Sequence, residues 1–147
     1  MNKIEIIFAQ DENTFSQCLK IREEVFTTEK GVPREIEADA LDCLNGPCDH
    51  FLIRFNGADI GAFRCAYMPE NIVRIQRLCI LKEFRGRGFG KAALAYVESH
   101  YQPPGCAAIE LDAKYDALPF YEKCGYKKTS KPFTEAGVLH VKMRKKL

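Results

Sequence analysis

The stretch that decides the fold is residues 77–90, which read RLCILKEFRGRGFG and carry three glycines at alternate positions. A strand-like apolar run enters this glycine loop, and an amphipathic helical pattern leaves it. Alternate glycines allow backbone N–H groups to close on an anion without interference from Cβ atoms, and a helix start adds unpaired donors and partial positive charge. Arg85, Arg87 and Lys91 add full charges. The stretch therefore suits a phosphate or pyrophosphate, although a tight basic surface turn would read the same way.

Two common nucleotide-binding loops do not fit this spacing. The P-loop requires G-x-x-x-x-G-K-[ST], whereas Arg85 stands here at the first glycine position and Ala92 at the hydroxyl position. The dinucleotide fingerprint requires G-x-G-x-x-G, whereas this loop is G-x-G-x-G and follows a chain of antiparallel type. Both loop types are therefore excluded.

The strand before the loop has a break in its alternation. Val73 and Ile75 are apolar at odd positions, whereas Leu78 and Ile80 are apolar at even positions. Because a strand has period two, the apolar face changes side near Arg77. One inserted residue, a β-bulge, would restore the register, and a strand buried on both faces would give the same pattern. The pattern alone leaves both explanations open.

Outside this stretch, hydrophobic periodicity predicts antiparallel hairpins followed by a strand–helix–strand crossover. Asn56-Gly57 signals a two-residue hairpin turn, because a type I′ turn needs positive φ at both positions. Strands are expected at residues 4–8, 51–55, 60–67, 72–81, 106–111 and 138–143, and helices at 15–26 after caps at 11–13, at 89–97, and in a short segment capped by Asp116, with Pro119 in its first turn and Cys124-Gly125 at its end. The loop over residues 29–49 is long enough to be functional or partly helical. This order predicts an α/β fold of the α+β type in one domain, residues 1–147.

Composition and charge exclude several classes of protein. The net charge of +2 and pI of about 8.1 do not indicate a nucleic-acid partner. No window approaches the roughly 18 apolar residues of a membrane span, and the charged start does not resemble a signal peptide. The seven cysteines form no visible framework, so buried free thiols in a reducing, cytoplasmic setting are expected. Cys43, Cys48 and His50 offer three ligands in no standard zinc spacing, so no metal is expected.

Two segments of the chain resemble motifs of one known protein family. The opening stretch resembles motif A of the GNAT superfamily of N-acetyltransferases, whose [Q/R]-x-x-G-x-[G/A] signature is matched by Arg85, Gly88 and Gly90. Residues 117–126, ALPFYEKCGY, resemble the family's motif B, A-x-x-F-Y-x-x-x-G-[F/Y]. Residues 21–42 look like small bacterial members of the ElaA/YjcF-like type. The resemblance implies the GNAT fold, a mixed, mostly antiparallel central sheet with a splayed, bulged strand and flanking helices.

The resemblance also implies that acetyl-CoA is the co-substrate and binds at the glycine loop. Backbone N–H groups of the loop and the Arg85 side chain would hold its pyrophosphate, and the strand end beyond the bulge would pair with its pantetheine arm. This favours the β-bulge over the doubly buried strand. The donor-binding positions carried over are Leu78, Cys79, Ile80, Arg85, Gly86, Arg87, Gly88, Phe89, Gly90 and Lys91.

Two catalytic groups follow from the same resemblance. The main-chain N–H of Leu78 would polarise the thioester carbonyl, as a fixed donor aimed at charge that develops in the transition state. Tyr121 matches the tyrosine that protonates the departing thiolate. A phenol and a thiol have pKa values of about 10 and 8.5, close enough for proton transfer. The plainer interpretation of Tyr121 is a core aromatic on an amphipathic helix.

Two positions depart from the family pattern. Gln76 stands where many members carry a glutamate as general base, and an amide cannot take up a proton. Lys114 stands where an asparagine often touches the pantetheine. The candidates for base or acceptor contact are Glu37, Asp39, Asp42 and His140. Each has a plainer interpretation, because loop carboxylates are usually solvated and a lone strand histidine is usually structural.

The acidic stretch over residues 35–42 suggests a cationic acceptor, because clustered carboxylates concentrate cations. The expected partner is a small-molecule or peptide amine, with no nucleic acid and no membrane, and the family allows a homodimer. A second hypothesis is a GNAT fold that senses acyl-CoA without catalysis. The amide of Gln76 in place of an acid supports this hypothesis, whereas the presence of Tyr121 argues against it. A third is transfer of another acyl group, or transfer to a hydroxyl.

Overall fold

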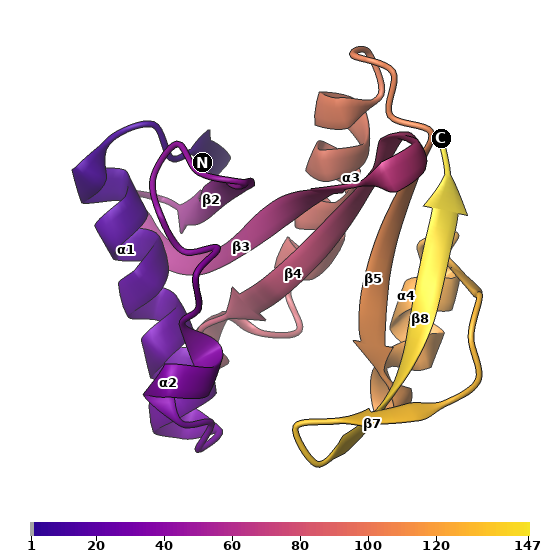
Figure 1. The fold of residues 1–147 in the computed structure, drawn as a ribbon. Helices are drawn as coiled ribbons and strands as arrows, with labels where there is room; N and C mark the ends of the chain where they lie inside the picture. The colour runs from indigo at the N-terminus through magenta and orange to yellow at the C-terminus, as the bar shows by residue number, and fades with distance from the viewer. Residues whose placement is uncertain (1) are drawn as a thin grey trace.

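The computed structural model describes residues 2–147 as one mixed sheet with helices on both faces (Figure 1). Its elements, in chain order, are β1 (Ile4–Phe8), α1 (Glu12–Arg22), the π-helical segment η1 (Glu23–Glu29), α2 (Arg34–Glu37), β2 (Cys48–Phe55), β3 (Ala58–Met68), η2 (Pro69–Asn71), β4 (Ile72–Ile80), η3 (Lys82–Phe84), α3 (Phe89–Tyr101), β5 (Ala108–Lys114), η4 (Tyr115–Ala117), α4 (Leu118–Lys123), β6 (Lys127–Lys128), β7 (Phe133–Glu135) and β8 (Val138–Lys146).

The sheet is mostly antiparallel, as predicted. Its strand order is β1-β2-β3-β4-β5-β8-β6, with β7 paired to β8. The one parallel pairing joins β4 to β5 and covers only Ile72–Arg74 against Ala108–Glu110. Beyond these residues the two strands separate, so the sheet divides into a β1–β4 arm and a β5–β8 arm (Figure 1). This confirms the splayed strand that the family resemblance implied.

The break in alternation on β4 is a β-bulge. Ala62 pairs with Cys79 and Arg64 with Gln76, so two steps along β3 oppose three steps along β4. The extra residue is accommodated at Arg77, whose φ is 59°. A non-glycine residue in this left-handed region is uncommon and is held here by the tertiary contacts described below. The bulge is confirmed over the doubly buried strand, and Leu78 is only half-buried.

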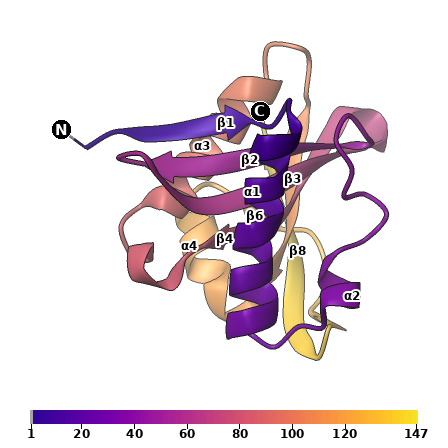
Figure 2. The ribbon, with the colours of Figure 1, turned by 90° about the vertical axis from the view of Figure 1, so that its left-hand side faces the viewer.

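Helices cover the two faces of the sheet unequally. The main core lies between the sheet and α3 and includes Phe51, Phe63, Val73, Leu94, Val97, Ile109 and Leu111. The second core lies under α1 and includes Phe15, Cys18, Ile21, Leu52, Ala62 and Cys79. Successive strand residues such as Phe51 and Leu52 enter opposite cores, because strand side chains alternate between faces. Figure 2 shows α1 lying across strands of the β1–β4 arm.

Most predicted elements are confirmed. The first strand occupies Ile4–Phe8 as expected, and the Asp11 carboxylate caps α1 by accepting the Thr14 N–H at 2.8 Å. The hairpin turn has φ of 49° at Asn56 and 83° at Gly57, as a type I′ turn requires. The loop after η1 is partly helical, because it contains α2.

Several expectations about elements were wrong. The strand expected at residues 51–55 begins at Cys48, and the strand expected at 106–111 runs from Ala108 to Lys114. The cap of α4 is Ala117 rather than Asp116, and no side chain makes a capping hydrogen bond there, although Pro119 does lie in the first turn. The short strands β6 and β7 were not predicted. The last strand extends to Lys146, three residues beyond its expected end.

The seven cysteines are free thiols. The expected burial is confirmed at Cys18, Cys48, Cys65 and Cys79, whereas it is wrong for Cys43, which is exposed, and Cys106 and Cys124 are half-buried. Among residues 2–147, no helix is long and apolar enough to cross a membrane.

Candidate active site

The glycine loop forms an open, donor-rich entrance to α3. Gly86 and Gly88 have φ of 75° and 88°, conformations that L-residues with a Cβ adopt at a cost. A Cβ placed on either glycine would meet no other atom within 4 Å, so the space above this backbone is free. Gly88 caps α3, and the first N–H groups of the helix, from Phe89 onward, lack intrahelical acceptors. The loop therefore has the geometry of an anion cradle.

The arginines of the loop are held by neighbouring groups. The Arg85 guanidinium donates to both carboxylate oxygens of Glu29 at 2.6 and 2.7 Å and to the Ile80 carbonyl at 2.8 Å. The same contact with Arg85 lowers the pKa of the Glu29 carboxyl. The guanidinium of Arg87 lies 5.0 Å from the centroid of the Phe55 ring, beside an open cavity of about 370 Å³. Lys91 is exposed on the first turn of α3.

The bulged end of β4 presents a free backbone edge. Beyond Arg74, β4 pairs with β3 only, so within residues 2–147 no strand covers its other edge. Leu78 lies in the bulge and has no register partner on β3. The Cys79 side chain turns into the second core, where burial raises the pKa of its thiol to about 12. Leu78 and Ile80 pack instead against the main core, so the free edge lies directly before the glycine loop.

Tyr121 lies on α4, next to that loop. A Cβ on Gly90 would lie 3.5 Å from Cζ of Phe120, which shows that α4 approaches the start of α3. The Tyr121 ring packs on Phe120 and Tyr126, with centroids 5.0 and 6.2 Å apart. Burial, and to a lesser degree Cys124, raises the pKa of Tyr121. The phenol therefore keeps its proton at neutral pH.

Three carboxylates of the acidic stretch, Glu37, Asp39 and Asp42, hold arginines. Arg22 donates to Glu37 at 2.8 and 3.1 Å and to Asp42 at 2.7 and 2.9 Å. Arg64 donates to Asp39 at 2.7 and 2.8 Å and to Asp42 at 2.9 Å. Both arginines are 1% exposed. These three carboxylates are paired internally, whereas Glu35 is exposed, so the cationic acceptor stays a prediction.

This arginine–carboxylate network reaches the bulge. Arg77 donates from Nε to the Glu37 carbonyl at 3.2 Å, and its terminal nitrogen lies 3.6 Å from Asp39. Gln76 accepts a hydrogen bond from Nε of Arg64 at 3.0 Å. The network therefore fixes the backbone on both sides of the insertion. Sequence reasoning missed this network, although Arg22 is a polar residue in the apolar stripe of the helix expected at residues 15–26.

Lys114 and His140, which were singled out from the sequence, lie opposite each other on β5 and β8. The His140 ring stacks on Phe133 with centroids 6.0 Å apart, and its Nδ1 lies 2.8 Å from the Val138 carbonyl. Burial and the adjacent Lys114 ammonium lower the pKa of Lys30. Two neighbouring cations, Lys30 after η1 and Lys114 at the end of β5, favour a negatively charged ligand.

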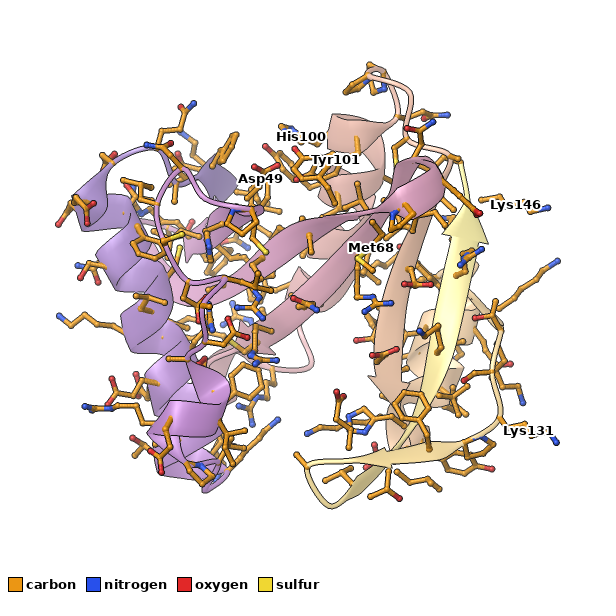
Figure 3. The ribbon with its side chains drawn as sticks, in the orientation of Figure 1. Asp49, Met68, His100, Tyr101, Lys131 and Lys146 are labelled. Atoms are coloured by element: carbon orange, nitrogen blue, oxygen red, sulfur yellow. The ribbon has the colours of Figure 1, made fainter. Side chains whose placement is uncertain are left out.

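A second cavity, of about 330 Å³, lies at the C-terminal end of α3 and is lined by Tyr67, Met68, His100 and Tyr101, among others. Figure 3 labels Asp49, His100 and Tyr101 in this region. Asp49 accepts hydrogen bonds from Tyr67 and Tyr101, both at 2.6 Å. A 13-residue helix is about 20 Å long, so this cavity is remote from the glycine loop. The described residues contain no group of three or more metal-ligating side chains.

The splayed sheet, the bulge and the anion cradle together define a CoA-dependent acyltransferase fold. Residues 24–147 match the acetyltransferase (GNAT) domain family, and the chain belongs to that family. It is 32% identical over 140 residues to the uncharacterized N-acetyltransferase YjcF of Bacillus subtilis, covering 95% of this chain and 97% of YjcF. A solved N-acetyltransferase-like structure from Lactobacillus plantarum superposes with a TM-score of 0.92 at 28% identity, over 98% of both chains. Escherichia coli ElaA superposes with a TM-score of 0.82 at 20% identity, over 99% of both chains. The ElaA/YjcF-like resemblance is thereby confirmed.

Proposed function

We propose that this chain transfers an acetyl group from acetyl-CoA directly to a primary amine in a ternary complex. The observation that carries the proposal is the free edge of β4 at the bulge, which leads into the anion cradle of the glycine loop. An aminoglycoside 6′-N-acetyltransferase of the same fold, with a TM-score of 0.74 at 14% identity over 98% of this chain and 96% of that one, is complexed with coenzyme A. A CoA-type donor suits the cradle because its pyrophosphate is an anion.

In this proposal the backbone N–H groups from Arg87 to Lys91 hold the pyrophosphate, and the pantetheine arm pairs with the β4 edge from Leu78 to Ile80. Arg85 would reach a phosphate only by releasing Glu29, since both ends of its guanidinium are engaged there. Its present contacts support a role in attaching η1 to the loop. Lys30 and Lys114 add positive charge near the donor.

The transfer uses one fixed donor and one acid. The N–H of Leu78, in the bulge, hydrogen-bonds the thioester oxygen as negative charge develops on it; loss of such a donor typically costs about 3–4 kcal/mol. The amine nitrogen attacks the carbonyl carbon, and the C–S bond breaks as the adduct collapses. The thiolate takes the proton of Tyr121, whose raised pKa keeps it protonated until that step.

The acceptor is a small-molecule or peptide amine. His140 lies at the end of the β5–β8 arm, beside Lys114, where it can contact an acceptor that enters between the arms. Glu37 and Asp39 act on the acceptor side through Arg22, Arg64 and the bulge, because their carboxylates already hold arginines.

The test is incubation of the purified chain with acetyl-CoA and an amine panel of spermidine, kanamycin, L-lysine, 2-phenylethylamine and a short peptide with a free N-terminus. Mass spectrometry of the amines and release of free thiol report transfer, and calorimetry reports CoA binding. We expect CoA binding and at least one acetylated amine. Failure to bind CoA would overturn the proposal.

A second candidate is a GNAT fold that senses acyl-CoA without catalysis. It is favoured by Gln76, whose amide is held by Arg64 and leaves β4 without a proton acceptor at that position. CoA binding with no acetylated product from any amine of the panel would support this candidate over the enzyme.

A further inference from the structure

In acetyl transfer to an amine the nitrogen gives up a proton, and the carboxylates near the point where the two arms separate differ in whether they are free to accept it. Glu37, Asp39 and Asp42 are engaged by Arg22 and Arg64. Glu110 on β5 is 4% exposed and accepts from Arg74 at 2.6 and 2.8 Å and from Arg144 at 3.0 Å. A carboxylate that holds arginines is a poor proton acceptor, because the cations favour its charged form.

Asp112 differs from these carboxylates because it holds no arginine among the described residues. Its Oδ1 is buried and has no hydrogen-bond partner among residues 2–147, and within the same residues it forms no ion pair. A buried carboxylate oxygen without a donor is costly and calls for an explanation. A bound group that supplies a proton at this oxygen would provide one.

The strand register places Asp112 on the face of β5 opposite the main core. Ile109 and Leu111, which flank Glu110 and alternate with Asp112, enter the main core under α3. Asp112 therefore lies on the opposite face, together with Glu110 and Lys114. Figure 1 shows α1 and α2 beside the β1–β4 arm, to one side of β5.

The register also relates Asp112 to the bulge. The last parallel pair is Arg74 with Glu110. Two residues further along each strand lie Gln76 and Asp112, on the same face as that pair but on separating arms. Gln76 directly precedes the bulge that holds Leu78. Asp112 thus follows the last parallel pair on one arm, as the backbone proposed to bind the thioester oxygen follows it on the other.

We propose that Asp112 is the proton acceptor of the acetyl transfer, which rests on the proposed function above. As the amine nitrogen forms its bond to the carbonyl carbon and the C–S bond breaks, the nitrogen proton passes to Asp112, directly or through one water. The thiolate takes a proton from Tyr121. Solvent removes the proton from Asp112 and returns one to Tyr121, so both groups recover their starting state.

The experiment compares Asp112→Asn with Asp116→Asn, a matched change at an exposed aspartate shortly after β5, using the panel amine that the unaltered chain acetylates fastest. We expect Asp112→Asn to lower kcat by about 100-fold or more, with CoA binding and the unfolding midpoint unchanged. Asp116→Asn should retain full kcat. Full kcat in Asp112→Asn, or equal losses in both variants, would overturn the assignment.

A second variant tests whether a carboxylate at this position accepts the proton. Asp112→Glu keeps a carboxylate on the same face of β5 and should retain at least tenfold more kcat than Asp112→Asn. Equal kcat in Asp112→Glu and Asp112→Asn would overturn the assignment of proton transfer to this carboxylate. If the unaltered chain binds CoA but acetylates no amine, the proposed function fails and this assignment with it. If transfer is intact in the unaltered chain and in Asp112→Asn, only the assignment fails.

Discussion

Tyr121 combines the two properties that a proton donor to a thiolate needs, namely a retained proton and a place beside the glycine loop. Burial raises its pKa, and α4 brings it next to the start of α3. We expect Tyr121→Phe to lower kcat by about 100-fold while leaving the affinity for CoA unchanged, because the ring still packs on Phe120 and Tyr126. Steady-state thiol release and calorimetry measure the two quantities.

The control for this variant is Tyr115→Phe, which removes a hydroxyl from a tyrosine that is 50% exposed and lies just before α4. Its kcat should match that of the unaltered chain. Undiminished kcat in Tyr121→Phe would show that the ring serves only packing, which is the plainer interpretation of its helical position.

At the residue scale, the sequence predicted motif positions well and side-chain partners poorly. The glycines and Tyr121 were found because each motif is local. The pairing of Arg22 with Glu37, and of Arg64 with Asp39, joins residues 15 and 25 positions apart. Neither periodicity nor spacing reports such contacts. A polar residue in an apolar stripe, as at Arg22, is the one signal that could have indicated them.

At the scale of the element, the glycine loop depends on left-handed backbone and on the empty space above it. We expect Gly88→Ala to weaken CoA binding by about tenfold or more, because the strain of roughly 1–2 kcal/mol is joined by a methyl group where the anion must approach. Calorimetric titration with CoA measures the loss.

Gly105→Ala is the matched control, since Gly105 follows the other end of α3, has φ of 107° and likewise meets no atom within 4 Å of an added Cβ. It should lower the free energy of unfolding by a similar amount and leave CoA binding unchanged. Equal CoA affinities in the two variants would contradict the assignment of the loop to the pyrophosphate.

Elements were predictable where periodicity lasted long enough. The apolar residues of β4 change from odd to even positions, which indicated the bulge, because Val73 and Leu78 cannot share one face of a regular strand. The strands β6 and β7, of two and three residues, are too short to show a period and form only because β8 offers its edge. The expected Asp116 cap failed because η4 precedes α4 and moves the cap to Ala117.

At the scale of the whole molecule, two arms meet over a parallel pairing of three residues on each strand. The β1–β4 arm contributes the bulge, the glycine loop and the arginine–carboxylate network. The β5–β8 arm contributes Asp112, Lys114 and His140, and α4 follows it with Tyr121. Each proposed chemical role therefore depends on the separation of the arms, which the short pairing sets.

The stability of the whole molecule should fall in two stages as pH decreases. Burial lowers the pKa of His50 below its ordinary 6.5; the residue is 2% exposed. Arg64 lowers the pKa of Asp39, and hydrogen bonds from Arg22 hold the pKa of Asp42 far below 3.8 against the effect of burial. In each case the unfolded chain binds the proton first, so stability present at higher pH is lost on acidification.

We therefore expect the free energy of unfolding to be nearly constant between about pH 7 and pH 8, to decline below about pH 6.5 as unfolded His50 becomes charged, and to decline more steeply below about pH 4 as unfolded carboxyls are protonated. Urea unfolding at a series of pH values measures both stages. His50→Gln should remove the first stage and keep the second, because it leaves the arginine–carboxylate network intact. Constant stability from pH 7 down to pH 4 in the unaltered chain would contradict the buried, neutral state of His50, and a missing second stage would contradict the pairing of Asp39 and Asp42 with arginines.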